Sequence, residues 1–446
     1  MMAREGNLEA PTRHPLPWKT AEFLDRAAAE QEMMRIYDIC HGCRRCFSLC
    51  QAFPLLFDAV DDTPTATVEA VPRKVLWEVV DQCYLCDLCY MTKCPYTPPH
   101  PFNLDFPHTM LRAKAIQFQE GKPNLRDKLL ASTDAMGKLA SIPVVVDMVN
   151  AVTHHPATRN LLHKTLGIHR DRQLPDYASP SFRHRAAPRE DFAVRTGQRT
   201  PGKVAIFATC YVNYNEPGIG QDLLQVLAHN QIPACLVAQE SCCGMPKLEL
   251  GDLAGVELLK QKNIPVLAAL AREGYALLAP VPSCVLSFNQ ELPLLFPEDE
   301  EVRMVAEAFY DPFEYLMARH ADGLLNTDFV RPLGKVSYHV PCHLRVQNIG
   351  LRTRDLLQMI PGTKVTTVER CSGHDGTWGV KVEYFDTSMK IGNPVFKRMK
   401  DAEPDVVSSD CPIAARHIVQ GMGDQTARAH PLTLLRRAYG LGEAPV

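Results

Sequence analysis

Two runs of cysteine constrain this chain more than any other feature of its sequence. The first run is CHGCRRCFSLC and the second is CYLCDLCYMTKCP, so each has three cysteines spaced by two residues and a fourth beyond them. Three thiolates at this spacing bind one face of an iron–sulfur cube, because a tight loop turns its amides and side chains inward. The fourth ligand of each cube must then come from elsewhere in the chain.

The last cysteine of each run supplies the missing ligand under the pairing rule of two-cluster ferredoxins, where it binds the cluster of the other run. We predict one [4Fe-4S] cluster bound by Cys40, Cys43, Cys46 and Cys94. The second [4Fe-4S] cluster is then bound by Cys83, Cys86, Cys89 and Cys50. A pair of zinc sites is the alternative, since CxxC pairs also bind zinc, but zinc leaves the third cysteine of each run unexplained.

Bulk properties indicate a soluble chain of two or three domains. Its 446 residues are 46% hydrophobic and 22% charged, and a net charge of −3 gives no reason to expect nucleic acid as a partner. The N-terminus lacks the apolar core of a signal peptide, and the most apolar later stretch, residues 264–282, is interrupted by Arg272 and Glu273. We therefore predict a cytoplasmic protein, with membrane contact only peripheral or through a partner.

The N-terminal part of the chain is expected to be helical around the cysteine runs. Apolar residues recur at helical spacing in residues 21–39, 72–82 and 109–120. We expect a flexible tail over residues 1–19 and an α-helical ferredoxin domain over residues 20–121. A helical extension follows over residues 122–168, and residues 169–201, rich in Arg, Pro and Ser, are predicted to be a linker or arm.

The remainder of the chain shows an α/β pattern that occurs twice. Apolar, β-branched runs begin at Gly202 and again at Gly334, and each is followed by a helical stretch and a second strand. Strand, helix and strand in this order indicate parallel sheets with crossover helices. We predict one repeat over residues 202–332 and another over residues 333–446.

Cysteines recur at matching places in the two repeats. In the first repeat they are Cys210, Cys242, Cys243 and Cys284. In the second repeat they are Cys342, Cys371 and Cys411. The carboxyl ends of parallel strands meet in one crevice, so each set is a candidate metal site. Buried core thiols are the alternative, and Cys235, which has no counterpart in the other repeat, is expected to be one.

The segments ESCCGMP, VPCHL, ERCSGHDGTWG and SSDCP, together with the eight cysteines of the two runs, resemble the CCG-domain iron–sulfur proteins. This family includes the B and D subunits of heterodisulfide reductase and the glycolate oxidase iron–sulfur subunit. The C subunit of anaerobic glycerol-3-phosphate dehydrogenase is the member most similar in layout. The resemblance implies a ferredoxin domain followed by two CCG repeats, and it covers about residues 35 to 440.

The resemblance also defines what this chain lacks. In the heterodisulfide reductase family a repeat can bind an unusual cluster through five cysteines, but Ser287 stands at the fifth position of the first repeat. That repeat keeps four thiolates for an iron–sulfur cluster or zinc. The second repeat has Ser372 and Ala414 at cysteine positions, so its fourth ligand is open between His343, His374, Asp410 and none. Histidines that only hydrogen-bond to a bound cluster are the simpler interpretation.

No motif for an organic cofactor accompanies the cysteines, since a full GxGxxG, a P-loop and HExxH are all missing from the sequence. We therefore predict an electron-transfer subunit that connects a partner redox enzyme, expected to be a flavoprotein dehydrogenase, with a CCG-domain metal centre, a quinone or another acceptor. One alternative is a catalytic heterodisulfide or thiol–disulfide reductase. Another is a redox partner of a non-haem iron protein of oxidative stress.

Overall fold

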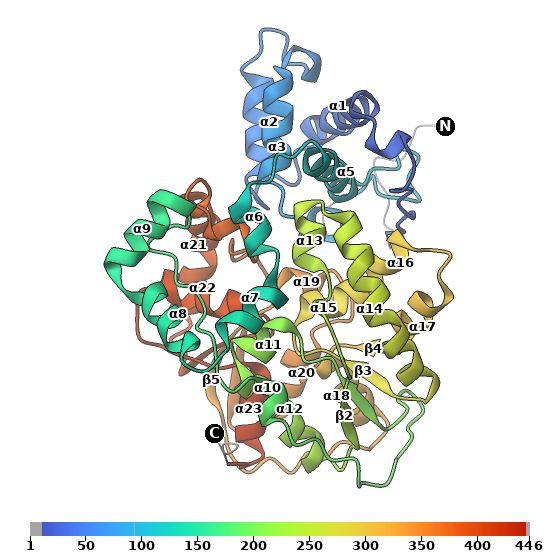
Figure 1. The fold of residues 1–446 in the computed structure, drawn as a ribbon, viewed down its shortest axis with the longest axis vertical. Coiled ribbons are helices and arrows are strands. Elements are labelled where there is room, and N and C mark those ends of the chain that lie inside the picture. Colours follow the sequence, from blue (N-terminus) through green and yellow to red (C-terminus); the bar gives the residue numbers. More distant parts are fainter. Residues whose placement is uncertain (1–10, 93, 443–446) are drawn as a thin grey trace.

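Two parallel sheets with the same strand order organise the larger part of the molecule. The computed structural model describes residues 11–92 and 94–442 (Figure 1). In the first sheet, with order β2-β1-β3-β4, the strands are β1 Val204–Ile206, β2 Ala234–Leu236, β3 Ala276–Leu278 and β4 Phe309–Tyr310. In the second, with order β6-β5-β7-β8, they are β5 Gly334–His339, β6 Thr363–Val368, β7 Val406–Ser409 and β8 Ala427–Arg428. The predicted α/β class with repeated parallel sheets is confirmed.

Helices form the N-terminal region, which lies at one end of the long axis in Figure 1. Its main helices are α1 Arg26–Cys43, α2 Ala52–Asp61, α3 Arg73–Gln82, α4 Leu88–Thr92 and α5 Phe106–Gln119. The next helices are α6 Leu125–Leu130, α7 Thr133–Ala140, α8 Val145–His154, α9 Pro156–Leu166 and α10 Phe182–Arg185. The fold therefore has the helical region with cysteine runs that the sequence predicts.

Helices follow every strand of both sheets, and those between two strands of one sheet are crossover connections. In the first repeat they are α11 Cys210–Tyr214, α12 Pro217–His229, α13 Met245–Leu250, α14 Leu253–Arg272, α15 Pro282–Leu286, α16 Leu292–Leu295, α17 Glu300–Ala308 and α18 Pro312–Ala321. In the second they are α19 Cys342–Arg345, α20 Arg352–Gln358, α21 Phe385–Asp401, α22 Pro412–Met422 and α23 Pro431–Ala438. Strands β1, β3 and β7 are buried at every residue, as expected where helices cover both faces of a parallel sheet.

Residues 11–19 differ from the flexible tail that we predicted for the N-terminus, whose residues 1–10 lie outside the described chain. The backbone N–H of Leu16 donates to Leu294 O at 2.9 Å, and the indole N–H of Trp18 donates to Leu295 O at 3.0 Å. Arg13 lies in an ion-pair cluster described below. Apolar and charged contacts across the fold hold this segment, and no local periodicity in the sequence reports such contacts.

The segment predicted as a linker or arm is extended and lies against both neighbouring regions. The guanidinium of Arg159 donates to the backbone carbonyls of His169, Arg170 and Arg172. Further along, the carbonyl of Arg189 accepts a hydrogen bond from the N–H of Ala234 at 2.8 Å, at the start of β2. These two contacts use the backbone of the arm, which also contains helix α10, where the side chain of Phe182 is fully buried.

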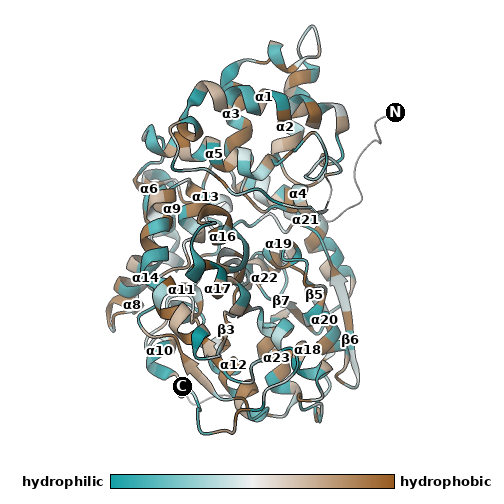
Figure 2. Cartoon of the chain, turned by 90° about the vertical axis from the view of Figure 1, so that its right-hand side faces the viewer, coloured by the Kyte–Doolittle hydropathy of each residue, from teal (hydrophilic) through white to brown (hydrophobic). Residues whose placement is uncertain are grey.

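No single helix in the described chain is long and apolar enough to cross a membrane. Helices α7 and α8, which meet at 111°, pass the length and composition test only as a bent pair. Figure 2 shows hydrophilic and hydrophobic residues alternating along most helices. Several large apolar side chains near the α7–α8 junction are exposed, namely Leu139, Ile142, Val144 and Met148.

A buried histidine at the start of α23 makes one acid-sensitive contact. His430 Nδ1 accepts from the N–H of Leu432 at 3.2 Å, and Nε2 donates to Asp410 O at 3.1 Å, so the neutral ring uses both nitrogens. Burial lowers the pKa of His430 to about 4. A histidine in the unfolded chain protonates near pH 6.5, so between pH 6.5 and 4 the unfolded state binds more protons than the folded state.

We expect stability to fall as the pH drops through that window, with His430 contributing about 3 kcal/mol of the loss. His430→Asn keeps a side chain that caps the helix but removes the titration. Denaturant unfolding from pH 7 to pH 4 should therefore show a shallower loss of stability in His430→Asn than in the wild type. Equal slopes for the two proteins would contradict this assignment.

Candidate metal centres

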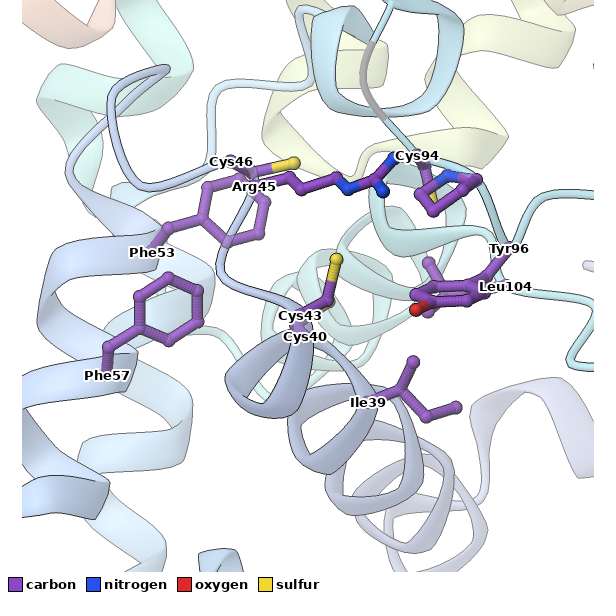
Figure 3. Close-up of a pocket in the computed structure, with 11 residues that line it drawn as sticks. Ile39, Cys40, Cys43, Arg45, Cys46, Phe53, Phe57, Cys94, Tyr96 and Leu104 are labelled. Carbon is purple, nitrogen blue, oxygen red and sulfur yellow. The ribbon is translucent and has the colours of Figure 1, made fainter. Parts of the chain in front are cut away.

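The four cysteines predicted to bind the first cluster line one pocket, shown in Figure 3. Cys40 and Cys43 lie on the last turn of α1, and the next residue, Arg44, has a left-handed backbone with φ 55°. Cys46 follows in the next turn, and Cys94 enters the pocket from the second run. Burial, and after it the thiols of Cys46, Cys94 and Cys43, raises the pKa of Cys40 well above its ordinary value.

The other four cysteines of the two runs form a second thiol set. Cys50 lies within electrostatic reach of Cys83. The thiol of Cys89 lies within electrostatic reach of the thiols of Cys46, Cys86, Cys83 and Cys50. Burial is the main cause that raises the pKa of Cys83 to about 11. Backbone N–H groups of Ala52 and Phe53, at the start of α2, point to the sulfur of Cys50 and favour its thiolate. The closeness of Cys46 and Cys89 places the two sets side by side.

Left-handed residues shape the second cysteine loop. Leu85 and Asp87, on either side of Cys86, have φ values of 51° and 60°. Alternating backbone conformations of this kind turn successive N–H groups inward, as anion-binding nests do. Arg13, which lies outside the loop, forms an ion pair with Asp87 in the loop, with Arg13 Nη1 2.6 Å from Asp87 Oδ2. Arg13 Nε also lies 3.0 Å from Asp105 Oδ2.

The four cysteines of the first repeat come together at the strand ends. We call them the first CCG site, and the three cysteines of the second repeat the second CCG site. Cys210 begins α11, Cys242 and Cys243 precede α13, and Cys284 lies in α15. Hydrogen bonds from the thiols of Cys210 and then Cys243 lower the pKa of Cys242 well below its ordinary value. Cys243 is in turn within hydrogen-bonding reach of Cys284. Gly244, with φ 100°, allows the sharp turn after the pair.

Helix α7 covers this first CCG site, which the sequence did not reveal. The hydroxyl of Thr133 donates to Cys242 Sγ at 3.3 Å, and a carboxylate oxygen of Asp134 accepts from the N–H of Cys242 at 2.6 Å. A polar pocket beside Cys210 is lined by residues that include Asp134 and Arg183. Ser287, at the position of the fifth cysteine, is buried, and its Oγ donates to Cys243 O at 3.0 Å. Ser287 therefore has a structural role.

The second CCG site has its three cysteines at the equivalent strand ends. Cys342 begins α19, Cys371 follows β6, and Cys411 is the N-cap of α22. Burial, and then the neighbouring thiols of Cys371 and Cys411, raises the pKa of Cys342 well above its ordinary value. Backbone N–H groups of Ala414 and Ile413 point to the sulfur of Cys411, as at Cys50.

The second cysteine loop meets the second CCG site directly. The hydroxyl of Tyr84 lies 3.0 Å from Cys371 Sγ, and Cys86 is within electrostatic reach of both Cys342 and Cys371. The ring of Trp378 is tilted against that of Tyr84, with ring centroids 5.2 Å apart, and its indole N–H donates to Asp81 O at 3.1 Å. Neither aromatic residue was a candidate from sequence, because nothing in the local pattern distinguishes it from a core residue.

The donor chemistry of these thiol sets suits iron–sulfur clusters, since soft thiolates select iron–sulfur clusters and zinc. Within residues 11–92 and 94–442, no three His, Cys, Asp or Glu side chains converge as the ligands of one metal ion would. In a cubane each thiolate binds a different iron, so its four ligands need not approach so closely. Cys235 lies apart on β2, beside Tyr275, and belongs to none of the sets.

Comparison with known proteins agrees with this arrangement. The family model of the cysteine-rich CCG domain matches residues 204–289 and 336–415. The chain is thus a CCG-domain protein, and the predicted resemblance is confirmed. It is 29% identical over 343 residues to the C subunit of anaerobic glycerol-3-phosphate dehydrogenase from Escherichia coli (strain K12), and the match covers 76% of this chain and 83% of that protein.

Two further proteins are also similar to this chain. The B subunit of fumarate reductase (CoM/CoB) from Methanothermobacter marburgensis is 27% identical over 259 residues, covering 56% of this chain and 49% of that protein. An uncharacterised iron–sulfur protein of Methanococcus maripaludis is 24% identical over 293 residues, covering 62% of this chain and 54% of that protein. The name of the second relative, like the thiol sets, points to iron–sulfur chemistry.

Proposed function

We propose that this chain is the iron–sulfur electron-transfer subunit of an oxidoreductase complex. Its ferredoxin-type cysteines would hold two [4Fe-4S] clusters, and the CCG cysteines a further cluster or zinc. When bound, such clusters accept and release single electrons. By analogy with the dehydrogenase relative, the partner would be a flavoprotein dehydrogenase, and the acceptor a quinone or another redox protein. Thiolate ligands require a reducing compartment, so we place the protein in the cytoplasm.

The observation that carries this proposal is the contact between the second cysteine loop and the second CCG site. Tyr84 and Cys371 touch at 3.0 Å although they are 287 residues apart in the chain. Both side chains are buried, as is Trp378 beside them. Electron transfer falls steeply with distance, so adjoining, buried thiol sets are what an electron-transfer protein requires.

The Tyr84→Phe variant should report on this contact. When Cys371 is a metal-bound thiolate, the phenol of Tyr84 donates the hydrogen bond to its sulfur, and hydrogen bonds to ligand sulfurs help to set the reduction potential. Because such a bond stabilises the reduced, more negative form, its loss should shift the potential of a centre bound at the second CCG site to more negative values. Redox titration followed by electron paramagnetic resonance (EPR) measures the shift.

Tyr90→Phe is the matched control for Tyr84→Phe. Tyr90 lies in the same cysteine loop, but its hydroxyl donates to the backbone carbonyl of Thr12 rather than to a cysteine. The control should leave the potential of the second CCG site unchanged. Equal potentials in Tyr84→Phe and the wild type would refute the tuning role of Tyr84.

The function itself is tested with holoprotein purified without oxygen. We expect the visible absorbance of the clusters to bleach on mixing with a reduced flavin and to return on addition of a soluble naphthoquinone. Failure of both reactions would contradict an electron-transfer role. Turnover of a disulfide substrate that Cys243→Ser abolishes would instead support a thiol–disulfide reductase.

A further inference from the structure

Helices α6–α9 leave much of their apolar surface uncovered by the described chain. Helix α6 has no buried residue, and α8 has one, Val146. Figure 1 shows α8 and α9 at the edge of the molecule. We call the exposed apolar side chains around the α7–α8 junction the α7–α8 surface, namely Leu139, Ile142, Val144, Met148 and Val152. Exposed apolar patches of this kind mark interaction sites in folded proteins.

Val144, which precedes α8, is both exposed and strained. Its side chain is 77% exposed. Its φ is 73°, a region in which a β-branched residue is a clear outlier and which glycine adopts at a lower conformational cost. Val144, Met148 and Val152 are spaced by four residues, so they share one face of the helix. Strain and exposure in one apolar residue indicate a role in binding rather than in folding.

The composition of the α7–α8 surface favours lipid over a protein partner. Leu and Val, which make up most of it, are under-represented among the residues that dominate protein interfaces, where Trp, Tyr and Arg are enriched. Between Leu139 and Val152 the only charged residue is Asp147. Helices α7 and α8 have the apolar composition of a membrane span only as a pair, and they meet at 111°. A bent apolar pair suits shallow insertion at a bilayer surface.

The charges around the α7–α8 surface suit anionic lipid. Residues 122–168 contain six Lys and Arg and three Asp, a net charge of +3, whereas the whole chain has −3. Arg126 forms an ion pair with Glu383, and Asp127 forms one with Lys381. The exposed charged side chains on α6–α9 are those of Lys128, Lys138, Lys164 and Asp147. Basic residues beside an apolar surface add attraction to a negatively charged membrane.

We propose that the α7–α8 surface docks on an anionic phospholipid membrane, with its apolar side chains inserted among the headgroups. This docking does not depend on the proposed function, but it bears on the first CCG site. The hydroxyl of Thr133, at the start of α7, lies 3.3 Å from Cys242 Sγ, and Leu139 lies about 9 Å further along the same helix. The first CCG site is therefore held close to the lipid, in which lipid-soluble quinones, one acceptor class of the proposed function, are dissolved.

The test measures sedimentation of the full-length holoprotein, purified without oxygen, with vesicles of phosphatidylethanolamine and phosphatidylglycerol. Vesicles of phosphatidylcholine alone carry no net charge and serve as the lipid control. Val144→Gly and Met148→Ser each remove an apolar side chain from the α7–α8 surface. Glycine suits the φ of 73°, so Val144→Gly should not destabilise the fold. Leu258→Ser, on α14, is the matched control, since Leu258 is 60% exposed and Met148 65%.

We expect the wild type and Leu258→Ser to bind the anionic vesicles equally. Val144→Gly and Met148→Ser should each bind at least about tenfold more weakly. The wild type should bind phosphatidylcholine vesicles more weakly than anionic ones, and equal binding to both would contradict the preference for anionic lipid. Reduction by flavin and reoxidation by the soluble naphthoquinone should be unchanged in both variants, so a failure of docking is distinguishable from a failure of electron transfer.

Three results would overturn the docking proposal. The first is a wild type that does not sediment with the anionic vesicles. The second is binding by Val144→Gly and Met148→Ser that equals that of the wild type, or an equal loss in Leu258→Ser. The third is a wild-type dimer that Val144→Gly dissociates, without vesicle binding, which would assign the α7–α8 surface to a second copy of this chain.

Discussion

The Cys94→Ala variant should lose the cluster of the first cysteine run, although Cys94 lies in the second run. Cys94 lines the same pocket as Cys40, Cys43 and Cys46, while its own run meets Cys50. We therefore expect Cys94→Ala and Cys43→Ala to give the same EPR spectrum, each with about four fewer irons per chain. Cys50→Ala and Cys86→Ala should share the complementary spectrum.

Cys235→Ala is the matched control for these substitutions, since Cys235 lies on β2 away from the thiol sets. It should keep the iron content and the spectrum of the wild type. If the spectrum of Cys94→Ala instead matched that of Cys86→Ala, each cluster would be bound within a single run. The crossed pairing proposed here would then be wrong.

The Arg13→Ala variant should destabilise the protein by about 3–5 kcal/mol, the cost of leaving a buried charge without its partner. Arg13 is 10% exposed and pairs with Asp87, Asp105 and Glu291. Even beside this arginine, burial raises the pKa of Asp87 to about 6, which shows how unfavourable its charge is there. Denaturant unfolding of the holoprotein measures the loss.

A second effect of Arg13→Ala should appear at the metal centre. Asp87 lies between Cys86 and Cys89, so the loop that holds these two cysteines loses its outside anchor. The cluster bound there should be released faster to an iron chelator than in the wild type. Arg35→Ala removes an exposed pair with Glu32 and should cost less than about 1 kcal/mol. Similar losses in the two variants would contradict a special role for Arg13.

Sequence periodicity and cysteine spacing predict the α/β class, the two parallel sheets and the cysteine-bearing strand ends. These features depend on local patterns that repeat, such as the runs that begin at Gly202 and Gly334. Strand lengths are predicted less well. Residues 202–210 appear as one apolar run, but β1 ends at Ile206 and the helix begins at Cys210. The chain must leave the sheet to turn the cysteine into the crevice.

Contacts between distant segments are what the sequence does not show. Tyr84 meets Cys371, Thr133 meets Cys242, and Arg13 meets Glu291, each across a long stretch of chain. Tyr84 stands inside the second cysteine run, but the cysteine spacing does not identify its contact, and Thr133 and Arg13 belong to no motif.

The central claim, that two adjoining cubane clusters lie in the N-terminal region, is tested most directly by EPR of the dithionite-reduced wild type, with iron and sulfide measured on the same sample. The account predicts about eight irons for the two ferredoxin-type sites. It also predicts spectra broadened by spin coupling, because Cys46 and Cys89 place the two sets side by side. Zinc in place of iron, or a single uncoupled cluster, would contradict it.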